Sequence, residues 1–332
     1  MKGELLDLLR CPQSGQRLEF VDCVNLGVRI QSGWLVSQDG RHRYPIRNFV
    51  PRFVPESNYA DNFGMQWNKF RMTQLDSHSG HAISAERFWK ATGWNPEDLA
   101  GYWVLDVGCG AGRFAEVALR AGARVVALDY SIAVDACYEN LMDHPNFHVV
   151  QGDIYALPFL NGAFHFVYSL GVLQHTPDVE KAFFALPPML IGGGRICVDF
   201  YQKSWKSALL PNHWLRPLTK RMPKVRLFSM LEYMVPILLP LSVWLGKCPI
   251  LGSGFKRLVP VANYVGILPL DGEQQLEWSL LDTFDWLSPK YDNPQKPKII
   301  QRWMEEACIE NIKVLKAGHL VGRGTIPYSP RH

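Results

Sequence analysis

The sequence has few cysteines, and they are not paired. The seven are odd in number and scattered, at positions 11, 23, 109, 137, 197, 248 and 308. A secreted disulfide framework needs an even set at regular spacing, so this usage predicts a reduced, cytoplasmic protein. Structural zinc needs four ligands, usually from two C-x-x-C pairs, and the sequence contains no such pair. We therefore expect neither disulfides nor a metal site.

Long hydrophobic runs are also missing. The most membrane-like run, residues 234–246, has 13 uncharged residues and is interrupted by Pro236 and Pro240. A spanning helix needs about 20 apolar residues. The first twenty residues carry Glu4 and Asp7 among the leucines, which is not the pattern of a signal-peptide core. We expect neither a transmembrane helix nor a signal peptide.

A strong net charge is absent as well. The chain holds 35 Lys and Arg against 31 Asp and Glu, and this formal charge of +4 does not by itself indicate a nucleic-acid-binding protein. The charge is unevenly distributed, because residues 201–270 contain ten basic residues and a single acid, Glu232. That segment carries +9, so the rest of the chain sums to −5.

What the chain does contain is a glycine-rich turn between an apolar strand and a helix, at residues 104–114 (VLDVGCGAGRF). Such glycines bring bare backbone close to a ligand, and the helix start offers unpaired N–H groups. The dinucleotide fingerprint G-x-G-x-x-G is not met, because Arg113 stands where the third glycine should be. No G-K-[ST] follows, which excludes a phosphate loop. The turn therefore predicts another kind of cofactor site.

This segment resembles the first motif of the class I S-adenosylmethionine-dependent methyltransferases, in the methyltransferase type 11 group. In that family an acidic residue after the second strand holds the ribose, and Asp129 stands there, 17 positions after Gly112. The segment 152–154 resembles the one that contacts the adenine. The resemblance implies S-adenosyl-L-methionine as the cofactor. The residues that it assigns to cofactor binding are Gln66, Asp106, Gly108, Gly110, Gly112, Asp129, Tyr130, Asp153 and Ile154.

Strand and helix patterns alternate on both sides of the glycine turn. Apolar strand patterns are found at 103–107, 124–128, 147–151, 164–169 and 194–200. Such alternation requires parallel pairing with right-handed crossovers. Two more strands, at 312–315 and 319–323, are expected to form an antiparallel hairpin. The sequence therefore predicts an α/β fold: a Rossmann-like seven-stranded methyltransferase sheet with a small N-terminal β-rich domain and a helical insertion.

Residues 1–55 are expected to form the small N-terminal domain. They resemble the zinc-ribbon-derived domain that activates tRNA methyltransferases and is also fused in front of other methyltransferases. Ser14 stands where a second cysteine would follow Cys11, so we expect a degenerate domain without metal. Docking of a substrate or partner and mere packing on the core both stay open as its role.

Residues 56–100 are expected to form a helical cap over the cofactor site. Phe63 and Trp67 lie four positions apart, which is typical of one buried helix face. The segment also resembles the amino-terminal part of methyltransferases from bacterial surface-polysaccharide pathways, where it covers the cofactor. Its candidate site residues are Tyr59, Gln66 and His78.

The loop after the fourth strand, residues 170–178, resembles the segment that follows strand four in many small-molecule methyltransferases. His175 in this loop is the candidate catalytic residue, because a histidine can take up the acceptor's proton as the methyl group arrives. The alternative is structural: His175 packs on the methionine end of the cofactor or caps the helix that starts after Asp178.

The methyltransferase core is expected to span residues 101–200 and 281–332. The segment between them, 201–280, combines prolines, large apolar residues and most of the basic charge. We favour a helical lid over the acceptor pocket; the alternative is an interfacial helix that touches anionic lipid at the inner membrane face. Residues 282–291 are expected to form a polar loop. The further candidate acceptor contacts are Asp285, Tyr291 and His319.

The main functional prediction is methyl transfer from S-adenosyl-L-methionine to the oxygen of a small-molecule, glycan or lipid-linked acceptor. Nucleic acid is not expected as a partner, because the basic residues are interleaved with bulky aliphatic ones and the chain lacks the Asn/Asp-Pro-Pro-Tyr/Phe motif of base-amine methylating enzymes. The enzymatic alternative is an RNA methyltransferase. The other alternative is a non-catalytic binding scaffold with the same fold.

Overall fold

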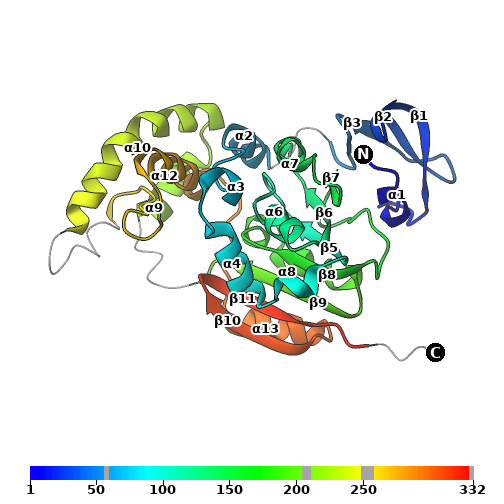
Figure 1. Cartoon of the computed structure of the whole chain (residues 1–332). Helices are drawn as coiled ribbons and strands as arrows, with labels where there is room; N and C mark the ends of the chain where they lie inside the picture. The colour runs from blue at the N-terminus through cyan, green and yellow to red at the C-terminus, as the bar shows by residue number, and fades with distance from the viewer. Residues whose placement is uncertain (56–59, 204–210, 248–257, 329–332) are drawn as a thin grey trace. The chain divides into compact units, whose positions relative to one another are not determined.

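The computed structural model describes residues 1–55, 60–203, 211–247 and 258–328 (Figure 1). The chain divides into two compact units. Unit 1 consists of Met1–Arg71, Ser84–Gln202 and Tyr291–His332. Unit 2 consists of Met72–Ile83 and Lys203–Lys290.

A seven-stranded sheet forms the centre of unit 1, with strand order β10-β11-β9-β8-β5-β6-β7. Its strands are β5 (Trp103–Val107), β6 (Arg124–Asp129), β7 (Phe147–Gln151), β8 (Phe164–Ser169), β9 (Leu190–Phe200), β10 (Glu310–Ala317) and β11 (His319–Thr325). The strands from β7 to β9 pair in parallel, whereas β11 is antiparallel to both β9 and β10. The predicted Rossmann-like sheet with an antiparallel last hairpin is confirmed.

Two hydrophobic cores lie on opposite faces of this sheet, because alternate residues of a strand point to opposite sides. Val104 belongs to the core that α4, α6 and α7 cover, and Leu105 to the core that α8 and α13 cover. The helices of unit 1 are α1 (Leu5–Leu8), α2 (Asp61–Lys69), α4 (Ile83–Thr92), α5 (Pro96–Leu99), α6 (Arg113–Arg120), α7 (Ala133–Leu141), η1 (Leu173–His175), α8 (Val179–Phe184), η2 (Pro187–Met189) and α13 (Pro297–Glu306).

The N-terminal segment folds as a small antiparallel sheet, drawn in blue in Figure 1. Its strands are β1 (Leu18–Leu26), β2 (Arg29–Ser37), β3 (Arg43–Arg47) and β4 (Val50–Pro51). Directly after β4, Arg52 forms a parallel bridge with Gln151, and the Phe53 N–H donates to the Gln151 carbonyl at 2.8 Å. The chain therefore runs beside β7 and joins the small sheet to the edge of the large one.

Cysteine in the small sheet takes part in packing. Cys11 is buried, and its Sγ lies 3.2 Å from the hydroxyl oxygen of Tyr44. Within the part of the chain that the structure describes, no group of three or more His, Cys, Asp or Glu side chains is arranged to hold a metal ion.

Unit 2 is helical and consists of α3 (Asp76–Ser79), α9 (Pro211–Thr219), α10 (Lys224–Gly246) and α12 (Gly272–Leu287). Phe228 of α10 packs edge-on against Phe284 of α12, with ring centroids 5.4 Å apart. A capping box of Asp271 and Gln274 starts α12. The helix continues to Leu287, so the polar loop predicted from residue 282 is wrong over its first part.

Helix α10 is continuous through Pro236 and Pro240 and has 23 residues, so it is longer than the apolar run recognised in the sequence. Among the described residues it is the one helix long and apolar enough to cross a membrane by length and composition, although 33% of its most apolar window is buried. A core helix of a soluble protein meets the same criteria. Its exposed large apolar side chains are Val225, Tyr233, Met234, Ile237, Leu241 and Trp244.

Candidate functional site

The glycine turn lies where β5 ends and α6 begins. Gly108, Gly110 and Gly112 have φ angles of 88°, 53° and 93°, in the left-handed region that favours glycine. A Cβ on Gly108 would meet Val172 at 2.4 Å, and a Cβ on Gly110 would lie 3.1 Å from Trp67. Both conformation and space therefore require glycine here, because Val172 of the loop after β8 and Trp67 of α2 pack directly against the backbone of the turn.

Asp129 stands at the end of β6 and is tied to the glycine turn. One carboxylate oxygen accepts from the Gly110 N–H at 3.0 Å, and the other accepts from the N–H and the hydroxyl of Ser131, both at 2.8 Å. Burial raises the pKa of Asp129, while these donors oppose the rise. The oxygen that accepts from Gly110 has a second lone pair, so Asp129 can still accept from a ribose hydroxyl.

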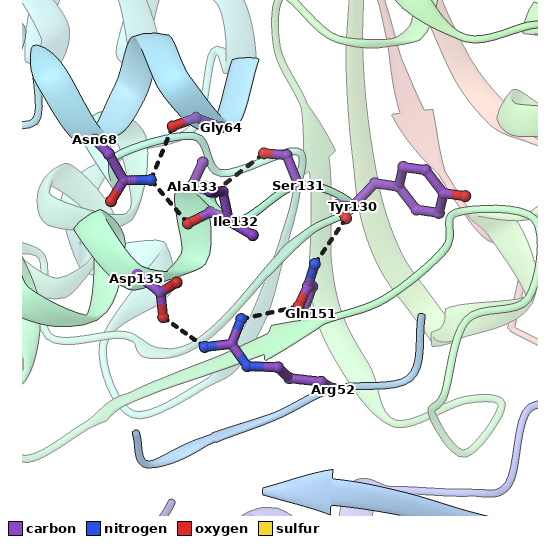
Figure 2. A network of polar contacts seen from close by, with 9 residues as sticks. All are labelled: Arg52, Gly64, Asn68, Tyr130, Ser131, Ile132, Ala133, Asp135 and Gln151. Atoms are coloured by element: carbon purple, nitrogen blue, oxygen red, sulfur yellow. Dashed lines mark hydrogen bonds and ion pairs between the residues drawn. The ribbon is translucent and has the colours of Figure 1, made fainter. Parts of the chain in front are cut away.

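The loop after Asp129 is held by a polar network, which Figure 2 shows. Arg52 is buried and donates to Gln151 at 2.9 Å and to Asp135 at 2.5 Å. The Gln151 amide in turn donates to the carbonyl of Tyr130 at 3.1 Å. On the other side of the loop, Asn68 of α2 donates to the Ile132 carbonyl at 3.0 Å. Residues from three separate segments thus fix the loop that begins at Asp129.

Asp153 and Ile154 follow β7 and lie next to this loop. The Gly152 N–H donates to the Asp129 carbonyl at 3.0 Å, which joins the two strand ends. The Asp153 carboxylate accepts from the Tyr155 N–H at 2.9 Å, and Ile154 is buried. The structure therefore brings the predicted ribose and adenine residues to neighbouring strand ends.

Asp106 lies inside β5 and is only 2% exposed. It pairs with Tyr168 on the neighbouring strand β8. Burial raises the pKa of Asp106 to about 8; the Tyr168 hydroxyl opposes this rise and the Asp129 carboxylate adds to it. Asp106 therefore does not contact a bound cofactor directly. It can affect the site only by supporting strand β5, which leads into the glycine turn.

Gln66 of α2 is 1% exposed, and neither atom of its amide has a hydrogen-bond partner among the described residues. Trp67, the next residue, packs over Gly110. A buried amide without partners costs free energy, and a bound ligand with polar edges would recover it. The glycine turn, the acidic residue after β6 and this amide together fit S-adenosylmethionine.

His175 lies in η1, directly after the β8 loop, and is 7% exposed. Its Nδ1 is 3.1 Å from the Tyr291 carbonyl oxygen, which can only accept, so Nδ1 carries the proton. Nε2 is then unprotonated and carries a lone pair. It is buried and has no hydrogen-bond partner in the described structure. The rings of Phe63 and Tyr201 flank the imidazole at 5.3 and 5.5 Å. This arrangement leaves a proton acceptor at the rim of the site.

The remaining predicted site residues are divided between the two units. His78 is exposed in α3 of unit 2, and Asp285 lies within α12 of the same unit. Tyr59 lies outside the described residues. Tyr291 contributes its carbonyl to His175, as given above, and His319 stacks on Tyr201 with centroids 5.3 Å apart.

Three site residues were missed in the sequence. Gln174 is fully buried next to His175, and its side-chain amide has no partner in the described part of the chain. Arg87 of α4 and Asp199 of β9 form a 3.1 Å ion pair close to Gly171. No local motif indicates Arg87 or Asp199, because they meet only through the fold, whereas Gln174 stands beside the candidate base.

Comparison with known families matches two parts of the chain. Residues 105–198 match the family described as a methyltransferase domain. Residues 2–48 match the family described as Trm112p-like protein. The small N-terminal sheet thus has a match of its own, and the resemblance of the chain to surface-polysaccharide enzymes stays a prediction.

Among curated proteins, the chain is similar to a tRNA U34 carboxymethyltransferase of Proteus mirabilis, with 28% identity over 193 residues. These cover 56% of this chain and 54% of that protein, so the chain spans about half the length of the curated relative. Among solved structures, it is similar to a putative S-adenosyl-L-methionine-dependent methyltransferase of Methanococcus maripaludis (TM-score 0.45, 14% identity, 83% of this chain and 98% of that one). Another is a complex of the Haloferax volcanii Trm112 methyltransferase activator with a putative methyltransferase (TM-score 0.34, 22% identity, 43% and 62%).

The core has the class I methyltransferase fold, and its cofactor is S-adenosyl-L-methionine. The expectation that nucleic acid is not a partner is contradicted, because the curated relative is named for a tRNA substrate and the N-terminal segment matches a Trm112p-like protein. That expectation relied on the interleaving of the basic residues with bulky aliphatic ones and on a missing sequence motif. Neither feature excludes a nucleic-acid acceptor that is bound by residues elsewhere in the chain.

Proposed function

We propose that this chain transfers the methyl group of S-adenosyl-L-methionine to RNA, with tRNA as the first acceptor class. The observation that carries this is the joining of a methyltransferase domain and a Trm112p-like segment in one chain. The similarity to a relative named as a tRNA enzyme supports the same acceptor. A cytoplasmic location, as the cysteine usage predicts, agrees with it.

The residues proposed to hold the cofactor follow the strand ends from β5 to β7. The backbone of Gly108, Gly110 and Gly112 would face the methionine part, and Asp129 would accept from the ribose hydroxyls. Asp153, Ile154 and Tyr130 would surround the adenine. The unpartnered Gln66 amide supports a polar contact from the α2 side. Asp106 is proposed to support the turn from within the strand.

In the proposed reaction, bound S-adenosylmethionine supplies an electrophilic methyl group on sulfur. The protein's part is to hold the acceptor atom in line, about 3 to 3.5 Å from the methyl carbon, and to exclude water. His175 would take the acceptor's proton at Nε2, since Nδ1 is fixed by the Tyr291 carbonyl. This step applies to a hydroxyl or N–H acceptor and is dispensable for a deprotonated one.

The roles of the flanking segments stay predictions. Residues 56–100 are proposed as the cap on the cofactor, a role consistent with the contact of Trp67 with the glycine turn. For residues 201–280 the lid remains our prediction and the interfacial helix its alternative; the exposed apolar side chains of α10 bear on the latter.

The test is methylation of transcribed tRNAs with radiolabelled S-adenosyl-L-methionine, alongside calorimetry with S-adenosylhomocysteine. We expect binding of the product and transfer to at least one tRNA, with no transfer by a variant that lacks Asp129. Product binding with transfer only to saccharide or lipid-linked acceptors would restore the small-molecule alternative. Product binding without any transfer would favour the scaffold, and no binding would reject the methyltransferase proposal altogether.

A further inference from the structure

The polypeptide between α2 and α4 is shared by the two units. Helix α2 and all of α4 except its first residue belong to unit 1, whereas residues 72–83 between them belong to unit 2. We call residues 72–83 the strap. The strap contains the short helix α3 and lies within the segment expected to cap the cofactor site. The contacts that hold its two ends and its middle therefore bear on both units.

The residue before the strap is tied to the glycine turn. The Arg71 carbonyl accepts from the Asn140 side-chain amide at 2.7 Å, and the Arg71 guanidinium donates to the Asn140 side-chain oxygen at 2.9 Å. The same amide nitrogen donates to the carbonyl of Ala111, within the glycine turn, at 2.9 Å. The Asn140 side chain thus uses both its donors and its acceptor to join the glycine turn to the start of the strap.

The residue after the strap is held close to the same turn. Ser84 is fully buried, and its hydroxyl accepts from the Arg113 Nε at 2.9 Å. Arg113 is the first residue of α6 and directly follows Gly112. Both ends of the strap are therefore fixed, one to the glycine turn and the other to the first residue of the helix that leaves it.

The middle of the strap is fastened to α12. The Thr73 hydroxyl donates to the Glu277 carboxylate at 2.7 Å, and the Trp278 ring N–H donates to the Thr73 carbonyl at 3.0 Å. Farther along the strap, the Gln274 side-chain amide donates to the Ser79 carbonyl at 3.0 Å. Thr73, Ser79 and Trp278 are buried, so water does not replace these contacts readily. All of them lie within unit 2.

The change from one set of contacts to the other takes only two residues. Arg71 is held by the side chain that also holds the glycine turn, and Thr73 is held by α12. Met72 between them is 37% exposed. Two residues of extended chain span at most about 7 Å, so the positions of Arg71 and Thr73 are not independent. A loss of motion at one of them is passed on to the other.

We propose that the strap couples the cofactor site to the helical unit. A ligand on the glycine turn restricts the residues that flank the strap, so the docking of the strap on α12 then costs less conformational entropy. By linkage, a docked strap raises the affinity of the turn for its ligand by the same factor. This inference rests on the proposed function and deepens it, since it names a way in which cofactor binding is regulated from unit 2.

The test compares hydrogen–deuterium exchange of the full chain with and without saturating S-adenosylhomocysteine. The backbone amides of the strap and of α12 are measured alongside those of the glycine turn. Thr73→Val removes the hydroxyl that bonds Glu277 and keeps the shape of the side chain. Thr283→Val is the matched control, because Thr283 is buried in the same helix and its hydroxyl bonds Ser279 and Ala262, outside the strap.

In the wild type, S-adenosylhomocysteine should slow exchange in the glycine turn, in the strap and in residues 272–279 of α12 by about fivefold or more. Thr73→Val should keep the slowing in the turn and lose it in α12, whereas Thr283→Val should keep both. If exchange in α12 does not respond in the wild type, or responds equally in Thr73→Val, the strap does not couple the units and the proposal is wrong. Loss of the response in Thr283→Val as well would trace it to the packing of α12 and would also reject the strap.

Calorimetry measures the reciprocal effect. Thr73→Val should bind S-adenosylhomocysteine about fivefold or more weakly than the wild type, because docking of the strap no longer contributes, and Thr283→Val should bind it as the wild type does. Equal affinity in all three proteins contradicts the coupling. A wild type that fails to bind S-adenosylhomocysteine rejects the proposed function itself, which is distinct from a wild type that binds it without any change in α12.

Discussion

Arg52 and Gln151 are hydrogen-bonded side chain to side chain at 2.9 Å, although the first follows the small N-terminal sheet and the second ends β7 of the large one. Gln151 passes the contact on to the Tyr130 carbonyl, in the loop that follows Asp129. The N-terminal segment therefore helps to position the loop proposed to bind the cofactor (Figure 2).

Arg52→Met should lower the free energy of unfolding by about 2–3 kcal/mol, because it leaves the buried acceptor of Gln151 and the half-buried carboxylate of Asp135 without their donor. It should also weaken S-adenosylhomocysteine binding several-fold, which urea unfolding and calorimetry measure together. Arg17→Met, an exposed change in the same small sheet region, should alter stability by less than about 0.5 kcal/mol. If Arg52→Met binds S-adenosylhomocysteine as tightly as the wild type, the network around Arg52 does not contribute to cofactor binding.

Asp129→Ala should weaken S-adenosylhomocysteine binding about ten- to hundredfold, because it removes a charged acceptor that the ribose hydroxyls would use. It also frees the Gly110 N–H, so some of the loss arises from a loosened turn. Asp129→Asn keeps the size and one acceptor oxygen and should lose less. The control is Asp143→Ala, an exposed acid after α7. Equal affinity in all four proteins would exclude Asp129 from the site.

The burial of Asp106 predicts a pH-dependent stability. Its pKa is raised to about 8 in the folded chain, from an ordinary value of 3.8 for a solvated aspartate. The folded state holds a proton that the unfolded state has released. The contribution of this proton to the free energy of unfolding is therefore complete below about pH 4 and is lost as the pH rises through 8. Asp106→Asn, which cannot ionise, should therefore gain stability relative to the wild type between pH 5 and pH 9. Urea unfolding at three pH values measures the difference, and a constant difference would contradict the raised pKa.

His175→Gln should lower kcat by about 10²–10⁴-fold if the acceptor is a hydroxyl or N–H, because Nε2 is then the proton acceptor. Product affinity should remain unchanged, which calorimetry checks. His165→Gln serves as the control, since the His165 ring packs at a tilt against Tyr102, near the start of β8 and away from the loop that carries His175. A variant at 175 that keeps its kcat but loses product affinity would show that the histidine packs on the cofactor instead.

The sequence was informative where structure is local. The glycine turn, the acid after β6 and the segment after β7 each lie within a few residues of a strand end, so their positions followed from the strand order. The loop predicted at 282–291 was partly wrong because α12 starts from a capping box at Asp271, eleven residues before position 282, and continues to Leu287. Helix α10 continues past Pro236 and Pro240 because both prolines are exposed, where unpaired carbonyls can meet water.

The acceptor side could not be predicted in the same way. Arg87 and Asp199 are 112 positions apart and form their ion pair only after α4 has packed on the sheet. Gln174 is an ordinary polar residue in the sequence, and only its burial without a partner distinguishes it. Pairwise contacts of this kind depend on the tertiary fold, which periodicity and short motifs do not encode.

The contact between the segment after β4 and strand β7 does not depend on protein concentration. Where two proteins must associate to form such a contact, its occupancy falls as either is diluted, whereas a tethered segment keeps a fixed local concentration. Here Arg52 and Phe53 reach β7 from within the same polypeptide. Every copy of the methyltransferase core is therefore made with its own copy of the small sheet, in a one-to-one ratio that expression level cannot alter.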